Sequence, residues 1–122
     1  MKIGRFEDIQ GWQEGRVLAR KTYELTNKSP FKRDRGLCNQ IQKASVSIMA
    51  NIAEGFDRQS KREFMKFLYY ASGSASEVQS HFYVALDQKY VSEEEFQNTY
   101  NQAKKVKSLI NGFIAYLKGK KK

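Results

Sequence analysis

The chain has 122 residues, of which 40% are hydrophobic and 13% aromatic, so it can form one compact core and is too aromatic for a disordered protein. No segment approaches the roughly 20 apolar residues of a membrane span, and the single cysteine, Cys38, cannot form an internal disulfide, which predicts one cytoplasmic domain. The formal net charge of +9 at pH 7 attracts polyanions and makes nucleic acid the leading class of partner.

Apolar residues recur at intervals of three and four between residues 7 and 27, which predicts a first helix there. Its stripe begins at Ile9, includes Trp12 and Tyr23, and is expected to face the core. Pro30 is expected to end the helix, because proline has no amide hydrogen with which to continue the backbone hydrogen bonds.

A second apolar strip of this helix lies nearly opposite the first and consists of Leu18, Thr22 and Leu25. An apolar strip outside the core often marks a subunit contact, and the nearby Gly11 and Gly15 would let another backbone come close. The three residues are therefore candidates for a homo-oligomer interface. The alternative is that they form the edge of one broad buried face, and the sequence favours neither interpretation.

A second helix is predicted at residues 35–57, where a further stripe runs from Leu37 to Ile52. Asp34 precedes it as a candidate N-cap, because an aspartate side chain can accept a hydrogen bond from the first free amides. Gly55 stands where a helix often ends, so the second helix is expected to finish near it.

Two serine–glutamate pairs, Ser60 with Glu63 and Ser92 with Glu95, have the spacing of a capping box and mark the starts of two further helices. Apolar stripes follow both pairs, so helices are predicted at residues 61–88 and 93–118, with a basic tail at 119–122. Four helices with short connections predict an all-α, antiparallel up-down four-helix bundle, in a single domain that covers residues 1–122.

The chain lacks a recognisable catalytic or metal-binding pattern. Its one histidine, His81, has a valine three positions earlier, where metal-binding bundles carry a glutamate, and Glu77 alone does not complete a site. No histidine other than His81 is available to activate Cys38 as a nucleophile. Glu54 and Glu63 lack a neighbouring base or metal that would organise them for acid–base catalysis. We therefore expect a protein that is not an enzyme and that needs neither a metal nor a cofactor.

Polar residues line one flank of the second helix and a corresponding flank of the third. One interpretation is a hydrogen-bonded seam that fixes the register of the two helices, since buried polar groups need partners. The other interpretation is a contact for a ligand or a second subunit. The seam residues are Asn51, Glu54, Arg58, Ser74 and Glu77.

Positive charge is concentrated at the two ends of the chain: residues 1–33 carry eight basic and four acidic side chains, and residues 91–122 carry seven and three. These cations are expected to contact phosphates, which positions a nucleic acid without reading its sequence. An alternative is a protein-interaction scaffold whose basic faces dock an acidic or polymerase-like partner. The candidate nucleic-acid-binding residues are Arg16, Arg20, Lys21, Lys28, Lys32, Arg33, Arg35, Lys104, Lys105 and Lys107.

Three stretches carry a resemblance to a known family. They are Phe6-Glu-Asp-Ile9-x-x-Trp12, the central block Ala44-Ser-Val-Ser-Ile48-x-x-Asn51-Ile-Ala-Glu-Gly55-x-x-Arg58-x-Ser60, and Glu63-Phe64-x-x-Phe67-Leu68-x-x-Ala71-x-Gly73-Ser74-x-x-Glu77. The chain resembles the four-helix bundle proteins encoded in intervening sequences of bacterial 23S ribosomal RNA genes, a family related in fold to the accessory variability determinant proteins of diversity-generating retroelements. Lys43 departs from the family pattern, which has an arginine there, so the charge remains and the guanidinium fork is lost.

The resemblance implies a four-helix bundle that assembles as a ring-like homopentamer. For the retroelement relatives it implies binding of nucleic acid and of a reverse transcriptase. It implies no established enzymatic activity. The leading hypothesis is therefore a non-catalytic, oligomeric protein that binds RNA or DNA, and docking of a reverse-transcriptase-like protein partner is the alternative.

Overall fold

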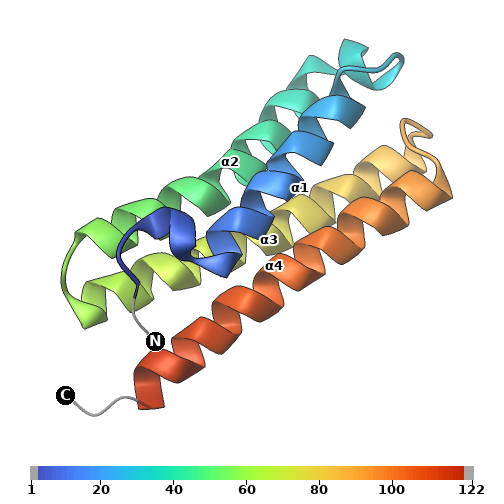
Figure 1. The fold of residues 1–122 in the computed structure, drawn as a ribbon. Coiled ribbons are helices and arrows are strands. Elements are labelled where there is room, and N and C mark those ends of the chain that lie inside the picture. Colours follow the sequence, from blue (N-terminus) through green and yellow to red (C-terminus); the bar gives the residue numbers. More distant parts are fainter. Residues whose placement is uncertain (1–2, 120–122) are drawn as a thin grey trace.

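The computed structural model describes residues 3–119, which form four α-helices and two short 3₁₀ turns (Figure 1). The all-α four-helix bundle predicted from the sequence is confirmed. Of the predicted basic tail, Gly119 belongs to the last helix, and residues 120–122 lie outside the described residues. The elements are η1 (Phe6–Asp8), α1 (Gln10–Thr26), η2 (Phe31–Arg33), α2 (Arg35–Asp57), α3 (Lys61–Asp87) and α4 (Glu93–Gly119).

Successive helices run in opposite directions and pack against their neighbours in the chain, and α1 closes the bundle against α4 (Figure 1). The α1–α2 and α3–α4 connections lie at one end of the bundle. The α2–α3 connection lies at the other end, where α1 begins and α4 finishes. Within the described part of the chain, every helix is too short or too polar to span a membrane.

The starts of α2 and α3 are capped as the sequence predicts. The Leu37 amide donates to Asp34 Oδ1 at 3.1 Å, and the Glu63 amide donates to Ser60 Oγ at 3.3 Å. The Tyr90 hydroxyl also donates to Asp34, at 3.0 Å from Oδ2, which raises the pKa of the tyrosine. Asp34 therefore ties the α3–α4 connection to the start of α2.

The face of α1 that enters the core differs from the predicted one. Leu18 and Thr22 are completely buried and Leu25 is nearly so, whereas Tyr23 of the predicted stripe is 47% exposed. The assignment of Leu18, Thr22 and Leu25 to an oligomer interface is therefore wrong, because these side chains pack inside their own bundle.

Two glycines explain why α1 turns this face inward. A Cβ added at Gly11 would lie 3.1 Å from Cγ1 of Ile110 in α4, and one added at Gly15 would lie 3.2 Å from Cγ2 of Ile48 in α2. The missing side chains let the backbone of α1 come close to both neighbouring helices. These glycines serve packing within the bundle, not contact with a second subunit.

Helix α2 ends at Asp57, as in the predicted range of 35–57, but the reason given for Gly55 is wrong. Gly55 does not adopt the left-handed backbone conformation of a helix end. A Cβ at this position would lie 2.6 Å from Cβ of Phe67 and 3.3 Å from the backbone oxygen of Phe64. Glycine stands here because α3 approaches the backbone of α2 closely.

Candidate nucleic-acid interface

Two shallow grooves on the outer side of α1 bring together four of the predicted cations. One groove of about 500 Å³ lies along α1 and is lined by Arg16, Arg20, Tyr23, Glu24 and Asn27, together with Ala19. The other, of about 380 Å³, lies between the end of α1, η2 and the start of α2. It is lined by Tyr23, Thr26, Asn27, Lys32, Arg35, Cys38, Asn39 and Gln42.

Because both grooves share Tyr23 and Asn27, they form one continuous surface. We call its four cations, Arg16, Arg20, Lys32 and Arg35, the basic strip. All four side chains are exposed, and among residues 3–119 no carboxylate oxygen lies within 4.0 Å of their charged nitrogens. Their positive charge is therefore available to an external anion.

Three other predicted cations are engaged in contacts between α1 and α4. Lys21 Nζ donates to Asn98 Oδ1 at 2.8 Å, and Lys105 Nζ lies 3.5 Å from Glu14 Oε1. The amide of Gln102 donates to the same Glu14 oxygen at 2.9 Å, and this bond, helped by Lys105, lowers the pKa of Glu14. The charges of Lys21 and Lys105 are thus partly used in holding the two helices together.

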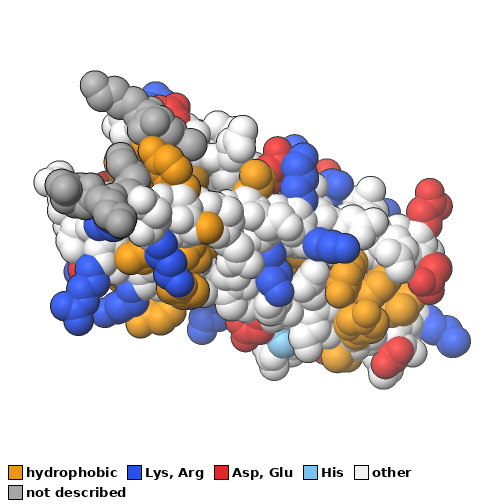
Figure 2. Space-filling view, turned by 90° about the horizontal axis from the view of Figure 1, so that it is seen from below, with side chains coloured by type: hydrophobic (Ala, Val, Ile, Leu, Met, Phe, Trp, Pro, Cys, Tyr) orange, Lys and Arg blue, Asp and Glu red, His pale blue; other side chains and the backbone are white. Residues whose placement is uncertain are grey.

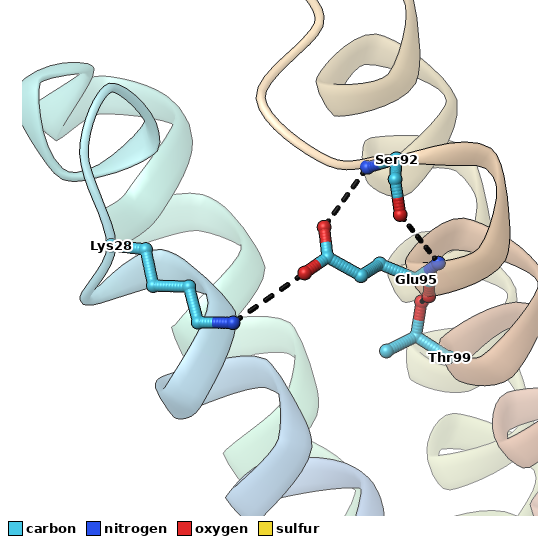
Figure 3. Close-up of polar contacts among 4 residues, drawn as sticks. All are labelled: Lys28, Ser92, Glu95 and Thr99. Atoms are coloured by element: carbon cyan, nitrogen blue, oxygen red, sulfur yellow. Dashed lines mark hydrogen bonds and ion pairs between the residues drawn. The ribbon is translucent and has the colours of Figure 1, made fainter.

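Lys28, the third of these cations, extends from the end of α1 to the start of α4 (Figure 3). Its Nζ lies 3.4 Å from Glu95 Oε2, while Glu95 Oε1 accepts from the Ser92 amide at 2.9 Å and the Glu95 amide donates to Ser92 Oγ at 3.0 Å. The Ser92 amide, and then Lys28, lower the pKa of Glu95. The predicted capping box of Ser92 and Glu95 is present, and Lys28 forms an ion pair with its glutamate.

The remaining candidates are dispersed. Arg33 is exposed in η2 beside Lys32 but lines neither groove, and Lys104 and Lys107 lie on α4. Sequence reasoning did not select Tyr23 and Asn27 for this surface, because Tyr23 was assigned to the core stripe. The signal that finds them is their spacing, since Tyr23 follows Arg20 and Arg16 by three and seven residues and so shares their helix face.

Only some residues of the predicted polar seam are connected to one another by hydrogen bonds. Ser74 Oγ donates to Ser47 Oγ across the α2–α3 junction at 3.1 Å, and Asn51 Nδ2 donates to the Ser47 hydroxyl at 3.0 Å. Glu54 and Arg58 instead form an exposed pair within α2 at 2.9 Å. The junction therefore favours the register interpretation for Asn51 and Ser74.

Glu77 and His81 make a separate contact within α3. Oε2 of Glu77 lies 4.0 Å from Nε2 of His81, which is too long for a hydrogen bond, and the buried Nε2 atom has no hydrogen-bond partner. In the described part of the chain, no group of three or more His, Cys, Asp or Glu side chains is placed to hold a metal ion.

The family model of the 23S rRNA-intervening sequence proteins matches residues 7–112. The chain belongs to this family. A solved structure of a protein of unknown function from the S23 ribosomal protein family, from Bacteroides thetaiotaomicron, is similar with a TM-score of 0.77 and 21% sequence identity. The match covers 85% of this chain and 97% of the other, and at this identity it shows a shared fold alone. No curated protein matches the chain.

The residues that carried the resemblance lie mainly where α2 packs on α3. Gly55 admits Phe67, and Ser74 reaches α2 through its hydroxyl. The residues of the central motif therefore contribute to the packing of α2 against α3. The basic strip lies elsewhere, on α1, η2 and the start of α2, and draws only on positions outside these motifs.

Proposed function

We propose that this protein is a non-catalytic, homo-oligomeric member of the 23S rRNA-intervening sequence family that binds nucleic acid through phosphate contacts along the basic strip. The observation that supports this proposal is the set of four exposed cations along two connected grooves, none of which has a carboxylate partner in the described part of the chain. Three of the four are arginines, whose planar guanidinium can donate two parallel hydrogen bonds to one phosphate.

Such contacts position a duplex and carry no base readout, so binding is expected to depend on charge and shape more than on sequence. The homo-oligomer is part of the proposal because the family resemblance implies a homopentamer. Repetition of the strip in each copy would let modest contacts add up, since the second and later contacts of one nucleic acid become intramolecular.

The test is fluorescence anisotropy with an RNA duplex and a DNA duplex of equal length across a salt series. The strip variant replaces Arg16, Arg20, Lys32 and Arg35 with Gln. Loss of four phosphate contacts is expected to reduce the slope of log K against log salt concentration by about 3 to 4 units. An unchanged slope would contradict the proposal.

A matched control removes the same number of charges from a different surface. It replaces the exposed residues Arg5, Arg58, Lys61 and Lys89 with Gln, so its net charge equals that of the strip variant. Duplex binding by the control is expected to keep the wild-type salt slope. Equal losses in both variants would mean that net charge alone drives the association. Copurification of an acidic protein, without duplex binding at low salt, would instead favour the interaction scaffold.

A further inference from the structure

Helix α3 carries two neighbouring tyrosines with half of their surface exposed. Tyr69 is 49% exposed and Tyr70 is 51% exposed, and both lie in the first half of the helix, away from the basic strip. Two adjacent half-exposed aromatic side chains are informative because contiguous exposed apolar patches, unlike single exposed residues, often mark a binding surface. The proposed phosphate-binding surface makes no use of them.

Neighbouring residues hold these rings in defined positions. The ring of Tyr70 meets that of Phe67 edge-on, with centroids 5.6 Å apart, and the guanidinium of Arg58 lies 5.0 Å from the Phe67 centroid. Lys118 Nζ, from α4, lies 5.6 Å from the centroid of Tyr69. Both tyrosines are therefore positioned against a cation or a second ring, while the rest of their surface remains open to a ligand.

Cations also precede the tyrosines along the same ridge of α3. Lys66 lies one turn before both rings and Arg62 lies two turns before them. Glu63 approaches Lys66 at 3.8 Å, but within residues 3–119 no carboxylate oxygen is within 4.0 Å of the charged groups of Arg62 or Lys118. Aromatic rings and available positive charge thus share one surface.

Gly73 leaves open space beside the two tyrosines. It lies one turn after Tyr69 and Tyr70, is exposed, and would meet no atom within 4 Å if it carried a Cβ. A helical side chain leans over the turn that precedes it, so a long side chain at position 73, such as leucine, would extend toward the tyrosines. Glycine inside a helix costs about 1 kcal/mol relative to alanine, and packing within the bundle does not explain its use here.

The other exposed part of α3 has a different character. Tyr83 is packed at 4.8 Å against the ring of Phe96, and its neighbourhood contains Asp87 and the acidic first turn of α4. Seen from below, exposed hydrophobic side chains gather at two places, one among Lys and Arg and the other bordered by acidic side chains (Figure 2). The half of α3 that carries Tyr69 and Tyr70 combines these rings with the cations of Arg62, Lys66 and Lys118.

We propose that Tyr69 and Tyr70 form a stacking platform for unpaired nucleic-acid bases, with Arg62, Lys66 and Lys118 contacting the adjacent phosphates. Single-stranded nucleic acids are bound by this combination, because every base has an aromatic face and every linkage a negative charge. A second copy of the chain fits this surface less well, because it would bury Arg62 and Lys118, which have no carboxylate oxygen within 4.0 Å among residues 3–119, and a buried unpaired cation is costly.

The inference rests on the proposed function only in that the partner is a nucleic acid, and it assigns a separate surface to unpaired segments. The test measures anisotropy with three probes of equal length: a single-stranded oligonucleotide, the same chain with abasic positions throughout, and a duplex. The variants are Tyr69→Ala/Tyr70→Ala, Tyr69→Phe/Tyr70→Phe and Gly73→Leu. Circular dichroism checks that each variant is folded.

The alanine variant is expected to bind the single strand more weakly by about 5- to 150-fold for each base that loses its stacking partner, with an unchanged salt slope because no phosphate contact is lost. Its binding to the abasic chain and to the duplex should equal that of the wild type. The phenylalanine variant keeps the rings and should retain binding, whereas Gly73→Leu should weaken single-strand binding while leaving the helix intact.

Equal single-strand affinity of the alanine variant and the wild type would overturn the inference. If duplex binding persists at the same time, the proposed function survives alone, and if the strip variant also leaves duplex binding unchanged, both proposals fail. A lower native mass of the alanine variant with unchanged single-strand affinity would show that this surface joins two copies of the chain and would likewise overturn the inference.

Discussion

Replacement of Gly55 by alanine tests whether the close approach of α2 and α3 controls the stability of the bundle. The new Cβ would lie 2.6 Å from Cβ of Phe67, about 0.8 Å short of the 3.4 Å at which ordinary contact begins. The opposing atom is fixed to the backbone of α3, so it cannot rotate away. The two helices must therefore separate along a junction that also holds the bond between Ser47 and Ser74.

Gly73→Ala provides the matched control, because a Cβ there meets nothing within 4 Å. Both substitutions gain about 1 kcal/mol of helix propensity, so the difference between them isolates the steric cost, which is about 1 to 3 kcal/mol for an overpacked core. With about 2.1 cal/mol/K of unfolding entropy for each of the 122 residues, this difference corresponds to roughly 4 to 12 °C in Tm.

The assay is thermal unfolding followed by circular dichroism, at one fixed protein concentration so that any change in assembly does not alter Tm by mass action. Gly73→Ala should unfold at a slightly higher temperature than the wild type, and Gly55→Ala should unfold clearly below Gly73→Ala. Equal Tm values for the two variants would refute the argument that Gly55 is required by the approach of Phe67.

Two further predictions concern titratable groups. The Ser92 amide and Lys28 lower the pKa of Glu95 from its ordinary 4.5, so its carboxylate stabilises the fold above pH 4.5 and this contribution is lost as the pH falls through the lower folded value. Glu95→Ala should thus lose less unfolding free energy in urea titrations between about pH 5 and pH 3 than the wild type does, and equal losses would contradict this. Burial raises the pKa of the Cys38 thiol, whose Sγ lies 3.2 Å from the backbone oxygen of Phe31. A disulfide reagent should therefore modify the folded protein at least about tenfold more slowly than the urea-unfolded chain, and comparable rates would show that the thiol is accessible.

The starts of α2, α3 and α4 were predictable because each depends on a few adjacent residues, whereas the first helix begins at Gln10 and not at the predicted residue 7. Ser92 and Glu95 satisfy each other's amides whatever the rest of the chain does, and Asp34 caps α2 by the same local rule. Helix ends were predicted to within one residue, but the reason for the glycine near the end of α2 was not. Gly55 has the residue type of a helix end, but its role depends on Phe67, twelve positions later and on another helix.

The inward face of α1 could not be chosen from periodicity. Two stripes in this helix have the same spacing, and the one with larger side chains at its start was the more plausible core face. The stripe that contains Gly11 and Gly15 faces the core, because α2 and α4 pack closest where α1 presents only backbone. As a result Leu18 is buried and Tyr23 lines the outer grooves.

By itself, the sequence determined the four helices, their caps, the excess of positive charge and the family to which the chain belongs, because each follows from composition or from residues close together in the chain. The tertiary structure decided which cations remain available. Lys21, Lys28 and Lys105 meet partners 67 to 91 residues distant on the facing helix, while Arg16, Arg20, Lys32 and Arg35 meet none within residues 3–119. The distinction arises because an ion pair depends on which faces of two helices come together, and that arrangement is fixed only when the core packs.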